Sequence, residues 1–306
     1  RAPLIVTQLI EASSLLYWVK KNKMNKFHYF CIFETDCNIC AYLLMKSNVY
    51  VNKIPSEVPL GFYNKVIISD SLSICFKYQE EEVKNNQDTM FIDKLNYWAP
   101  ELTFTVIRDY TTLERNVASK GKIGFYSSAC WLRKMNGAID LGENDFENEE
   151  VLLVWLFEYI KKNPKLSLTI FLHPMEKKEA IWERTKRYYD QFKSLAPFSI
   201  ADIDKKSIEY MDEVDLGVSR FSTVMFERIF WGFKTILSPM GNRDFPIRTS
   251  SFSNICIDNK EELFAKLDKN IPLSEEEYFK LNEMPGYTFS SIPYFSKRNS
   301  LIQEVK

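Results

Sequence analysis

Two short motifs in the second half of the chain place phosphate-binding residue types directly after apolar runs. His173-Pro174 follows the run at 166–172, and Ser222-Thr223 follow a shorter run at 215–218. An imidazole at a strand end can act as a general acid or bind a phosphate. Hydroxyls at the first turn of a helix add donors to its free backbone N–H groups, which attract an anion together with the helix dipole. The two motifs therefore predict a site for a phosphate-bearing ligand.

The residues around each motif predict its geometry. Pro174 stops the strand and fixes the backbone, so we expect the imidazole of His173 to point out of the sheet. Ser222 has the N-cap position of a helix predicted over 223–231 and closed by a glycine, and Glu227 in that helix can accept hydrogen bonds from sugar hydroxyls. The competing interpretations are a structural histidine at a strand end and an ordinary capped helix with a solvated glutamate.

A third polar stretch follows the predicted strand at 122–126. We expect Ser127 and Ser128 to cap the next helix and to lie at the ligand site, and Arg133 to reach an anionic ligand. The planar guanidinium suits a carboxylate or a phosphate. The alternative is that Ser127 only caps the helix and that Arg133 forms a surface ion pair.

These motifs need elements that place them at one edge of a sheet, and the hydrophobic pattern supplies such elements. Apolar runs and helical stripes alternate along the chain, which predicts parallel sheets in an α/β fold. A polar pause at 118–122 predicts a linker. Ligands bind beyond the carboxyl ends of the strands in such sheets. Strands are expected at 3–7, 27–33, 65–69, 103–107, 122–126, 166–172, 215–218 and 234–237, and helices at 9–20, 149–162, 176–194, 223–231 and 260–268.

The domain prediction is two Rossmann-like domains that face each other across a cleft. Residues 1–118 form the N-terminal domain and residues 119–306 form the C-terminal domain, which ends in a helical tail from Ser274. Because all three polar motifs fall in the second domain, we expect that domain to bind the phosphate-bearing ligand.

Two elements resemble parts of the nucleotide-binding half of GT-B glycosyltransferases. One is a predicted strand followed by His-Pro, and the other is a predicted strand followed by Ser-Thr and by a helix that contains Glu and ends at Gly. The resemblance covers roughly residues 122–237 and is closest to bacterial sialyltransferases and polysialyltransferases. In that family the histidine contacts the nucleotide phosphate and assists the leaving group, and the Ser/Thr pair holds the CMP phosphate. The resemblance thus implies these roles for the motif residues, which are His173, Pro174, Ser222 and Thr223. It also implies that the domain formed by residues 1–118 binds the acceptor.

The resemblance implies a metal-independent, inverting transfer of sialic acid from CMP-sialic acid to a glycan acceptor in bacterial surface polysaccharide synthesis, as in a capsule or lipooligosaccharide. No D-x-D motif stands at a predicted strand end to call for a metal ion. Three alternatives stay open. They are a GT-B transferase that uses a UDP-sugar or another nucleotide-sugar, an epimerase or hydrolase on the same fold, and a non-catalytic carbohydrate-binding or scaffold subunit.

The catalytic base is the feature in which the chain departs from that family. The family has two acidic residues followed by glycine in its N-terminal half, and this chain has no such triplet. Asp70 is our predicted base, because it ends the predicted strand at 65–69. The alternative carboxylates after other predicted elements are Glu34, Asp36, Glu143 and Asp145.

The amino-acid composition limits the classes of binding partner and the cellular location that we expect. The 40 Lys and Arg residues balance the 41 Asp and Glu residues, which argues against a nucleic-acid partner. The chain has one C-x-x-C, at 37–40, and two histidines, whereas a zinc site would need two more ligands with similar spacing. We therefore expect reduced thiols rather than a zinc site. No apolar run reaches the roughly 18 residues that span a bilayer. We expect a cytoplasmic protein, with peripheral contact at the inner membrane through the basic, aromatic stretch 18–30 as an open alternative.

Overall fold

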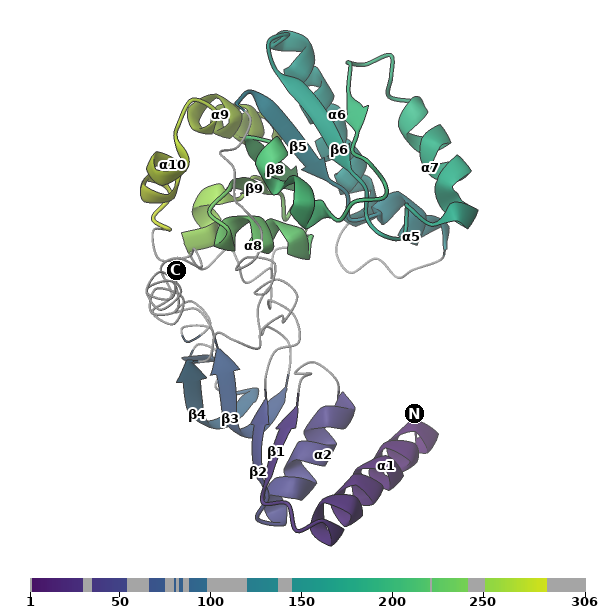
Figure 1. The fold of residues 1–306 in the computed structure, drawn as a ribbon, viewed down its shortest axis with the longest axis vertical. Helices are drawn as coiled ribbons and strands as arrows, with labels where there is room; N and C mark the ends of the chain where they lie inside the picture. The colour runs from purple at the N-terminus through teal and green to yellow at the C-terminus, as the bar shows by residue number, and fades with distance from the viewer. Residues whose placement is uncertain are drawn as a thin grey trace, which may run out of the picture. The chain divides into compact units, whose positions relative to one another are not determined.

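The computed structural model describes residues 2–29, 35–53, 66–74, 80, 83–84, 88–97, 120–136, 145–220, 222–241 and 251–284. The chain divides into two compact units, Arg1–Leu113 and Glu114–Lys306, and each unit has its own parallel sheet (Figure 1). The domain boundary predicted from the sequence, at 118/119, lies slightly further along the chain.

The N-terminal unit is a four-stranded sheet with two helices. Its strands lie in the order β1-β2-β3-β4, and every neighbouring pair is parallel. Helices α1 and α2 pack on each other, and buried aliphatic side chains from both meet side chains of β2. The elements are α1 (Ala2–Lys21), β1 (Lys26–Tyr29), α2 (Thr35–Lys46), β2 (Tyr50–Lys53), β3 (Ile67–Ile74) and β4 (Met90–Tyr97).

The strand predicted at 3–7 is wrong, because α1 runs through these residues without a break. A short apolar run fits a strand or a buried helix segment equally well. Pro3 lies in the first turn of α1, where the backbone N–H that proline lacks has no partner within a helix. The strand predicted at 27–33 overlaps β1, and the one predicted at 103–107 lies outside the described residues.

The C-terminal unit is a five-stranded parallel sheet in the order β7-β6-β5-β8-β9. Its strands β5, β6, β8 and β9 match the predicted strands within two residues at either end. The elements are β5 (Lys122–Tyr126), α5 (Cys130–Met135), α6 (Asp145–Lys162), β6 (Ser167–Phe171), α7 (Glu179–Asp190), β7 (Ser199–Ile200), η1 (Ser207–Glu213), β8 (Leu216–Ser219), α8 (Thr223–Phe230), β9 (Lys234–Leu237), η3 (Ser251–Ile255), α9 (Lys260–Asn270) and α10 (Glu275–Leu281).

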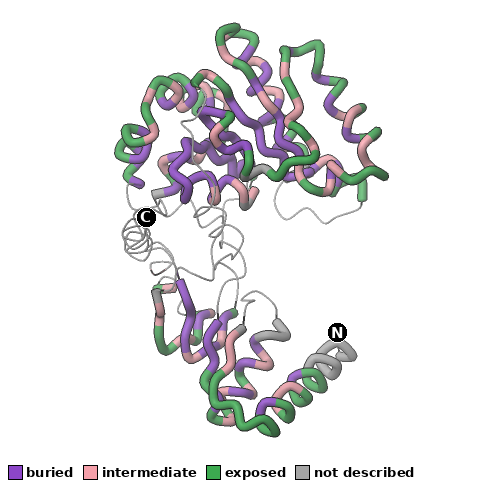
Figure 2. Tube along the Cα trace, viewed as in Figure 1, coloured by how far each residue is buried: buried purple, intermediate pink, exposed green. Residues whose placement is uncertain are grey.

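The core of this unit lies between its sheet and the flanking helices. Every residue of β8, inside the sheet, and of β9, at the end of the strand order, is buried, which indicates that both faces of these parallel strands are covered (Figure 2). The apolar stripe predicted on the helix at 149–162 is confirmed, because all five of its side chains are buried in this core. They are Leu152, Leu153, Leu156, Phe157 and Ile160.

Arg228 of α8 is fully buried and ties four segments together. Its guanidinium donates to the Tyr126 hydroxyl at 3.0 Å and to the backbone carbonyls of Met211 at 2.8 Å, Lys234 at 3.3 Å and Val214 at 3.4 Å. It also lies over the aromatic ring of Tyr126. These contacts hold α8, and therefore the Ser222-Thr223 turn, against β5 and β9.

We predict that Gly217→Ala destabilises the protein by about 1–3 kcal/mol. A Cβ at this position would meet the Arg228 Nε at 2.5 Å and its Cδ at 2.9 Å. The arginine has no room to move aside without giving up its hydrogen bonds. Urea unfolding of both proteins measures the change, and an unfolding free energy within about 0.5 kcal/mol of wild type would show that the arginine adapts.

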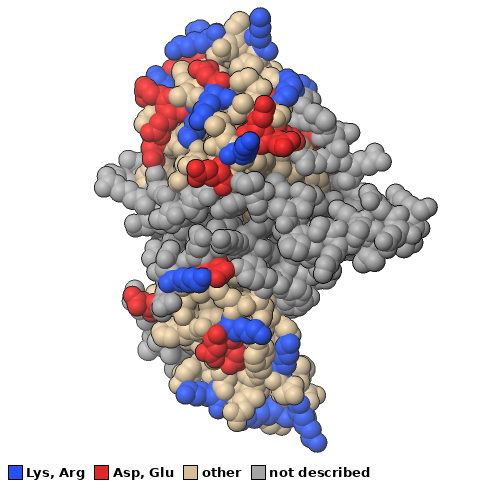
Figure 3. All heavy atoms as spheres, turned by 90° about the vertical axis from the view of Figure 1, so that its left-hand side faces the viewer, with Lys and Arg blue, Asp and Glu red and all other residues tan. Residues whose placement is uncertain are grey.

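Positive and negative side chains alternate over the described surface in the view of Figure 3, in keeping with the balanced composition. Within the described ranges, no helix is both long enough and apolar enough to cross a membrane.

Candidate functional site

The carboxyl ends of β6, β5 and β8 lie side by side, because β5 pairs with both of the other strands. Two hydrogen bonds join these ends. The backbone N–H of Ser127 donates to the carbonyl of Phe171 at 3.0 Å, and the Ser219 hydroxyl donates to the carbonyl of Tyr126 at 2.6 Å. The structure thus brings the segments with His173, Ser127 and Ser222 to one edge of the sheet, which we call the carboxyl edge.

His173 is half-buried two residues after β6, and Pro174 beside it is exposed. The backbone N–H of Met175 donates to the His173 Nδ1 at 3.2 Å, so that nitrogen carries no proton and the neutral ring has its N–H at Nε2. Burial and the positive charge of Arg133 lower the pKa of His173 to about 4. Near neutral pH the ring is therefore an uncharged hydrogen-bond donor.

Arg133 is exposed on α5, and its Nε donates to the carbonyl of Ser128 at 3.0 Å. Its influence on the pKa of His173 means that the two side chains share one electrostatic environment. Its other guanidinium nitrogens are suited to an anion at the carboxyl edge.

Ser127 and Ser128 do not cap α5 in the predicted way. The N-cap residue is Ala129, which has a φ of 55° and no side chain that could cap. The Ser127 hydroxyl accepts the Ala129 N–H at 2.9 Å, within the turn before the helix. Both serines are buried.

The anion at the start of α5 comes from the protein itself. The carboxylate of Glu149, 3% exposed on α6, accepts the backbone N–H groups of Ser128 and Cys130, the latter at 2.7 Å. Burial raises the pKa of Glu149, while these two N–H groups and the positive charge of Arg220 act in the opposite direction. Because Glu149 occupies these donors, this turn is not available to a ligand phosphate in the way that the sequence predicts.

Glu176 is a second buried carboxylate at the carboxyl edge, and it is not among the site residues predicted from the sequence. It accepts hydrogen bonds from the indole N–H of Trp131, from the Tyr189 hydroxyl at 3.0 Å and from the backbone N–H of His173 at 2.8 Å. The sequence signal that could have identified Glu176 is its position three residues after His173, since an acidic side chain at that spacing can accept the backbone N–H that begins a turn.

We predict that ionisation of Glu176 weakens the fold as the pH rises. Burial and the negative charge of Glu149 raise its pKa from 4.5 to about 7. The folded state therefore holds this proton more tightly than the unfolded state. The stability that it contributes is complete below pH 4.5 and is lost as the pH rises through about 7.

Urea unfolding of wild type and Glu176→Gln at several pH values measures this contribution. We subtract the unfolding free energy of the variant from that of wild type at each pH. We expect this difference to fall by about 3 kcal/mol between about pH 4.5 and about pH 8. Both proteins contain His173 and Glu149, whose own titrations largely cancel in the difference. A difference that does not vary with pH would contradict the prediction.

Ser222 is the N-cap residue of α8 and Thr223 is the first helical residue, as predicted. The Ser222 side chain makes no capping hydrogen bond to the helix, whereas Asn259 and Ser274 cap α9 and α10 with their side chains. The hydroxyl and the first N–H groups of α8 are thus arranged to meet an anion. Glu227 is half-buried one turn after Thr223 on the same side of α8.

The predicted position of Asp70 is wrong, because β3 continues to Ile74 and Asp70 lies inside the strand. Its carboxylate accepts the backbone N–H of Val51 at 2.6 Å, which extends the pairing of β2 with β3. The topological argument for Asp70 as the base therefore no longer holds. Of the alternatives, Asp36 lies in α2, Asp145 begins α6, and residues 34 and 143 lie outside the described ranges.

Cys40, Cys130 and Cys256 are free thiols. In the ranges that the structure describes, no three His, Cys, Asp or Glu side chains come together in a way that could hold a metal ion.

No family model matches the chain. No curated protein matches it in sequence either. Among solved structures, Acinetobacter baumannii MurG is similar over 92% of this chain and 75% of its own, at 12% identity and a TM-score of 0.52. A Listeria monocytogenes protein assigned as a UDP-N-acetylglucosamine 2-epimerase is similar over 89% of this chain and 72% of its own, at 13% identity and a TM-score of 0.51. With the two parallel sheets, these likenesses establish that the chain has an α/β fold of the GT-B type.

Proposed function

We propose that the chain is a glycosyltransferase that uses a nucleotide-sugar donor, and that its C-terminal unit binds the donor nucleotide. One observation carries this proposal. His173 after β6 and Ser222-Thr223 after β8 lie at the same edge of the sheet, on either side of β5. An uncharged Nε2–H donor and the start of a helix at this edge can both meet a phosphate.

In the proposed reaction, the hydroxyl oxygen of a glycan acceptor forms a bond to the anomeric carbon of the donor sugar. The bond from that carbon to the phosphate oxygen breaks, and its electron pair leaves with the phosphate. The Nε2–H of His173, the Ser222 hydroxyl and the N–H groups at the start of α8 stabilise this developing charge. The acceptor proton passes to a base that we leave unassigned.

The donor that we propose first is CMP-sialic acid, with transfer to a bacterial surface polysaccharide. The His-Pro and Ser-Thr motifs support it, since they resemble those of bacterial sialyltransferases. Arg133 would then face the donor's carboxylate. A UDP-sugar is the second candidate, because one of the solved structures above is assigned as an epimerase of UDP-N-acetylglucosamine.

A thermal-shift panel of CMP, UDP, GDP, ADP and dTDP, on wild type and on His173→Ala, tests the proposal. A nucleotide that binds only the folded state raises the melting temperature. We expect CMP to stabilise wild type and to stabilise the variant less. Stabilisation by UDP alone would replace the sialyl donor with a UDP-sugar. If no nucleotide stabilises wild type, a non-catalytic carbohydrate-binding subunit becomes the better explanation.

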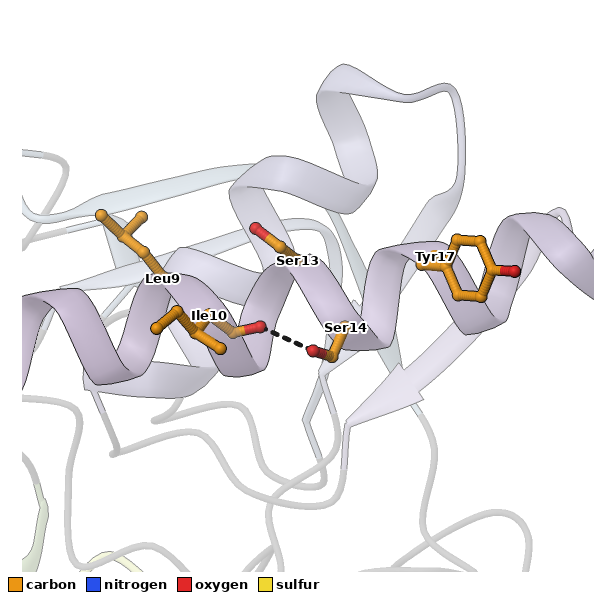
Figure 4. Close-up of a pocket in the computed structure, with 5 residues that line it drawn as sticks. All are labelled: Leu9, Ile10, Ser13, Ser14 and Tyr17. Atoms are coloured by element: carbon orange, nitrogen blue, oxygen red, sulfur yellow. Dashed lines mark hydrogen bonds between the residues drawn. The ribbon is translucent and has the colours of Figure 1, made fainter.

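We also propose peripheral contact with an anionic bilayer through α1. Its outer face has a shallow hollow of about 520 Å³ lined by Leu9, Ile10, Ser13, Ser14 and Tyr17 (Figure 4). Tyr17 and Trp18 are 68% and 51% exposed, and exposed lysines follow at 20, 21 and 23. Aromatic rings beside basic side chains suit the surface of an anionic membrane.

Sedimentation with vesicles tests the membrane contact. We expect wild type to bind phosphatidylcholine vesicles that contain phosphatidylglycerol, and binding to fall when salt is added or when Trp18 is replaced by serine. Equal recovery in the supernatant with and without the anionic lipid would contradict it.

A further inference from the structure

Glu176 holds the turn that begins at His173 from both of its ends. The backbone N–H of His173 donates to the Glu176 carboxylate at 2.8 Å, and the backbone N–H of Glu176 donates to the His173 carbonyl at 2.9 Å. Met175 lies between them, and its N–H donates to the ring Nδ1. The shape of this turn therefore sets which ring nitrogen of His173 accepts and which one carries the proton.

The surroundings hold Glu176 in place. Its side chain is fully buried, and its carboxylate also accepts the Tyr189 hydroxyl from α7 and the indole N–H of Trp131 from α5. Its backbone carbonyl accepts the Thr185 hydroxyl at 2.9 Å. Two helices thus fix one carboxylate, and that carboxylate fixes the turn after β6.

We infer that Glu176 is a positioning residue that holds the His173 ring in one orientation and one tautomer, with the N–H at Nε2 facing away from the turn. The inference rests on the proposed function for its catalytic meaning, since this N–H is the donor that would meet the phosphate. The tautomer itself does not depend on any substrate.

Glu176→Gln tests the inference because glutamine keeps the size of the side chain but not its two acceptor oxygens. The amide nitrogen must face either the His173 N–H or the pair formed by Trp131 and Tyr189. In both cases the amide N–H groups point at another N–H donor, which is left without an acceptor. The turn then loosens, and the Met175 N–H no longer holds Nδ1. We expect the ring to populate both neutral tautomers.

The measurement is ¹⁵N spectroscopy of the histidine rings without any nucleotide, at about pH 8, where Glu176 in wild type is ionised. The chain has only two histidines, so His28→Asn assigns the spectrum. Glu149→Gln is the matched control, because it changes a buried carboxylate that contacts α5 but not the 173–176 turn. We expect the Nε2–H tautomer alone in wild type and in Glu149→Gln.

The inference would be overturned if Glu176→Gln shows only the wild-type tautomer. It would also be overturned if the His173 ring of wild type is protonated at Nδ1. If Glu176→Gln does not fold, Glu176→Asp replaces it, since aspartate keeps the charge but is one carbon too short for the same contacts. In turnover we expect kcat to fall by about 10-fold or more, with the donor KM changed less than about threefold. If no nucleotide binds wild type, the proposed function is wrong, but the result on the tautomer is unaffected.

Discussion

Replacing His173 with alanine will lower kcat for sugar transfer by about 100-fold or more, while the protein keeps its cooperative unfolding transition. The variant loses the Nε2–H donor that the Met175 contact directs away from the turn. In the proposed reaction the ring would stabilise charge that appears only as the phosphate departs, so kcat should fall more than affinity for the donor. Steady-state kinetics with the nucleotide-sugar identified by the thermal-shift panel measures both quantities.

His173→Gln separates hydrogen-bond donation from proton transfer, because its amide can donate but cannot give up a proton. Activity between that of alanine and wild type would indicate donation to the phosphate. His28→Asn is the matched control in the other unit, where the ring contacts Asn52. An alanine variant at 173 within a few-fold of wild-type kcat would remove this histidine from the mechanism.

The wild-type protein should also show no loss of activity from protonation of His173 between about pH 6 and about pH 8, because the pKa of this ring lies near 4. A titration in that range would have to come from another group, and Glu176 with its pKa near 7 is the candidate.

The largest effect on stability is expected from Arg228→Met, which should lower the unfolding free energy by about 3 kcal/mol or more. Methionine fills much of the space but leaves the Tyr126 hydroxyl and the carbonyls of Met211, Val214 and Lys234 without their donor. Unmet buried acceptors cost more than a typical hydrogen bond contributes. Urea unfolding followed by circular dichroism measures the change.

Arg184→Met is the matched control, because Arg184 is exposed on α7. We expect its unfolding free energy to stay within about 0.5 kcal/mol of wild type. Arg228→Lys should fall between wild type and methionine, since lysine keeps the charge but has one nitrogen for several acceptors. A loss below about 1 kcal/mol in Arg228→Met would mean that the buried guanidinium contributes little to holding α8.

Four strands of the C-terminal sheet, β5, β6, β8 and β9, could be predicted because most of their residues are buried, whereas β7, whose two residues are exposed and half-buried, was not predicted. Buried strands appear as continuous apolar runs, and each run ends where a polar motif begins, as at His173 and Ser222. The stripe on α6 was visible for the same reason, since five apolar side chains recur at helical spacing.

The interior of β3 could not be predicted from its residue types. The segment Ser69-Asp70-Ser71-Leu72-Ser73 has the composition of a loop, and the strand was therefore expected to end there. In the structure Ser71 and Ser73 are buried and donate to the side chain of Asn52 on the neighbouring strand. The pairing of β3 with β2 on one side and with β4 on the other makes this polar sequence a strand.

The two buried carboxylates were hidden for a similar reason. Glu149 belongs to a run of acidic residues at the start of α6, where a solvated face is the usual interpretation, and Glu176 precedes two lysines. Their burial depends on N–H groups that other segments bring to them, from residues 128 and 130 and from residues 131 and 173. Apart from the three-residue spacing of His173 and Glu176, the sequence carries no information about these partners until the fold is known.

The most direct test of a donor site in the C-terminal unit is a titration of wild type with the panel nucleotides, followed through the ¹⁵N and ¹H signals of the two histidine rings. We predict that one nucleotide shifts the His173 signals in a saturable way and leaves those of His28, on β1 of the other unit, in place. The Ser222→Ala variant should weaken that saturation. Binding that leaves His173 unmoved, or no binding by any nucleotide, would contradict the assignment of this site.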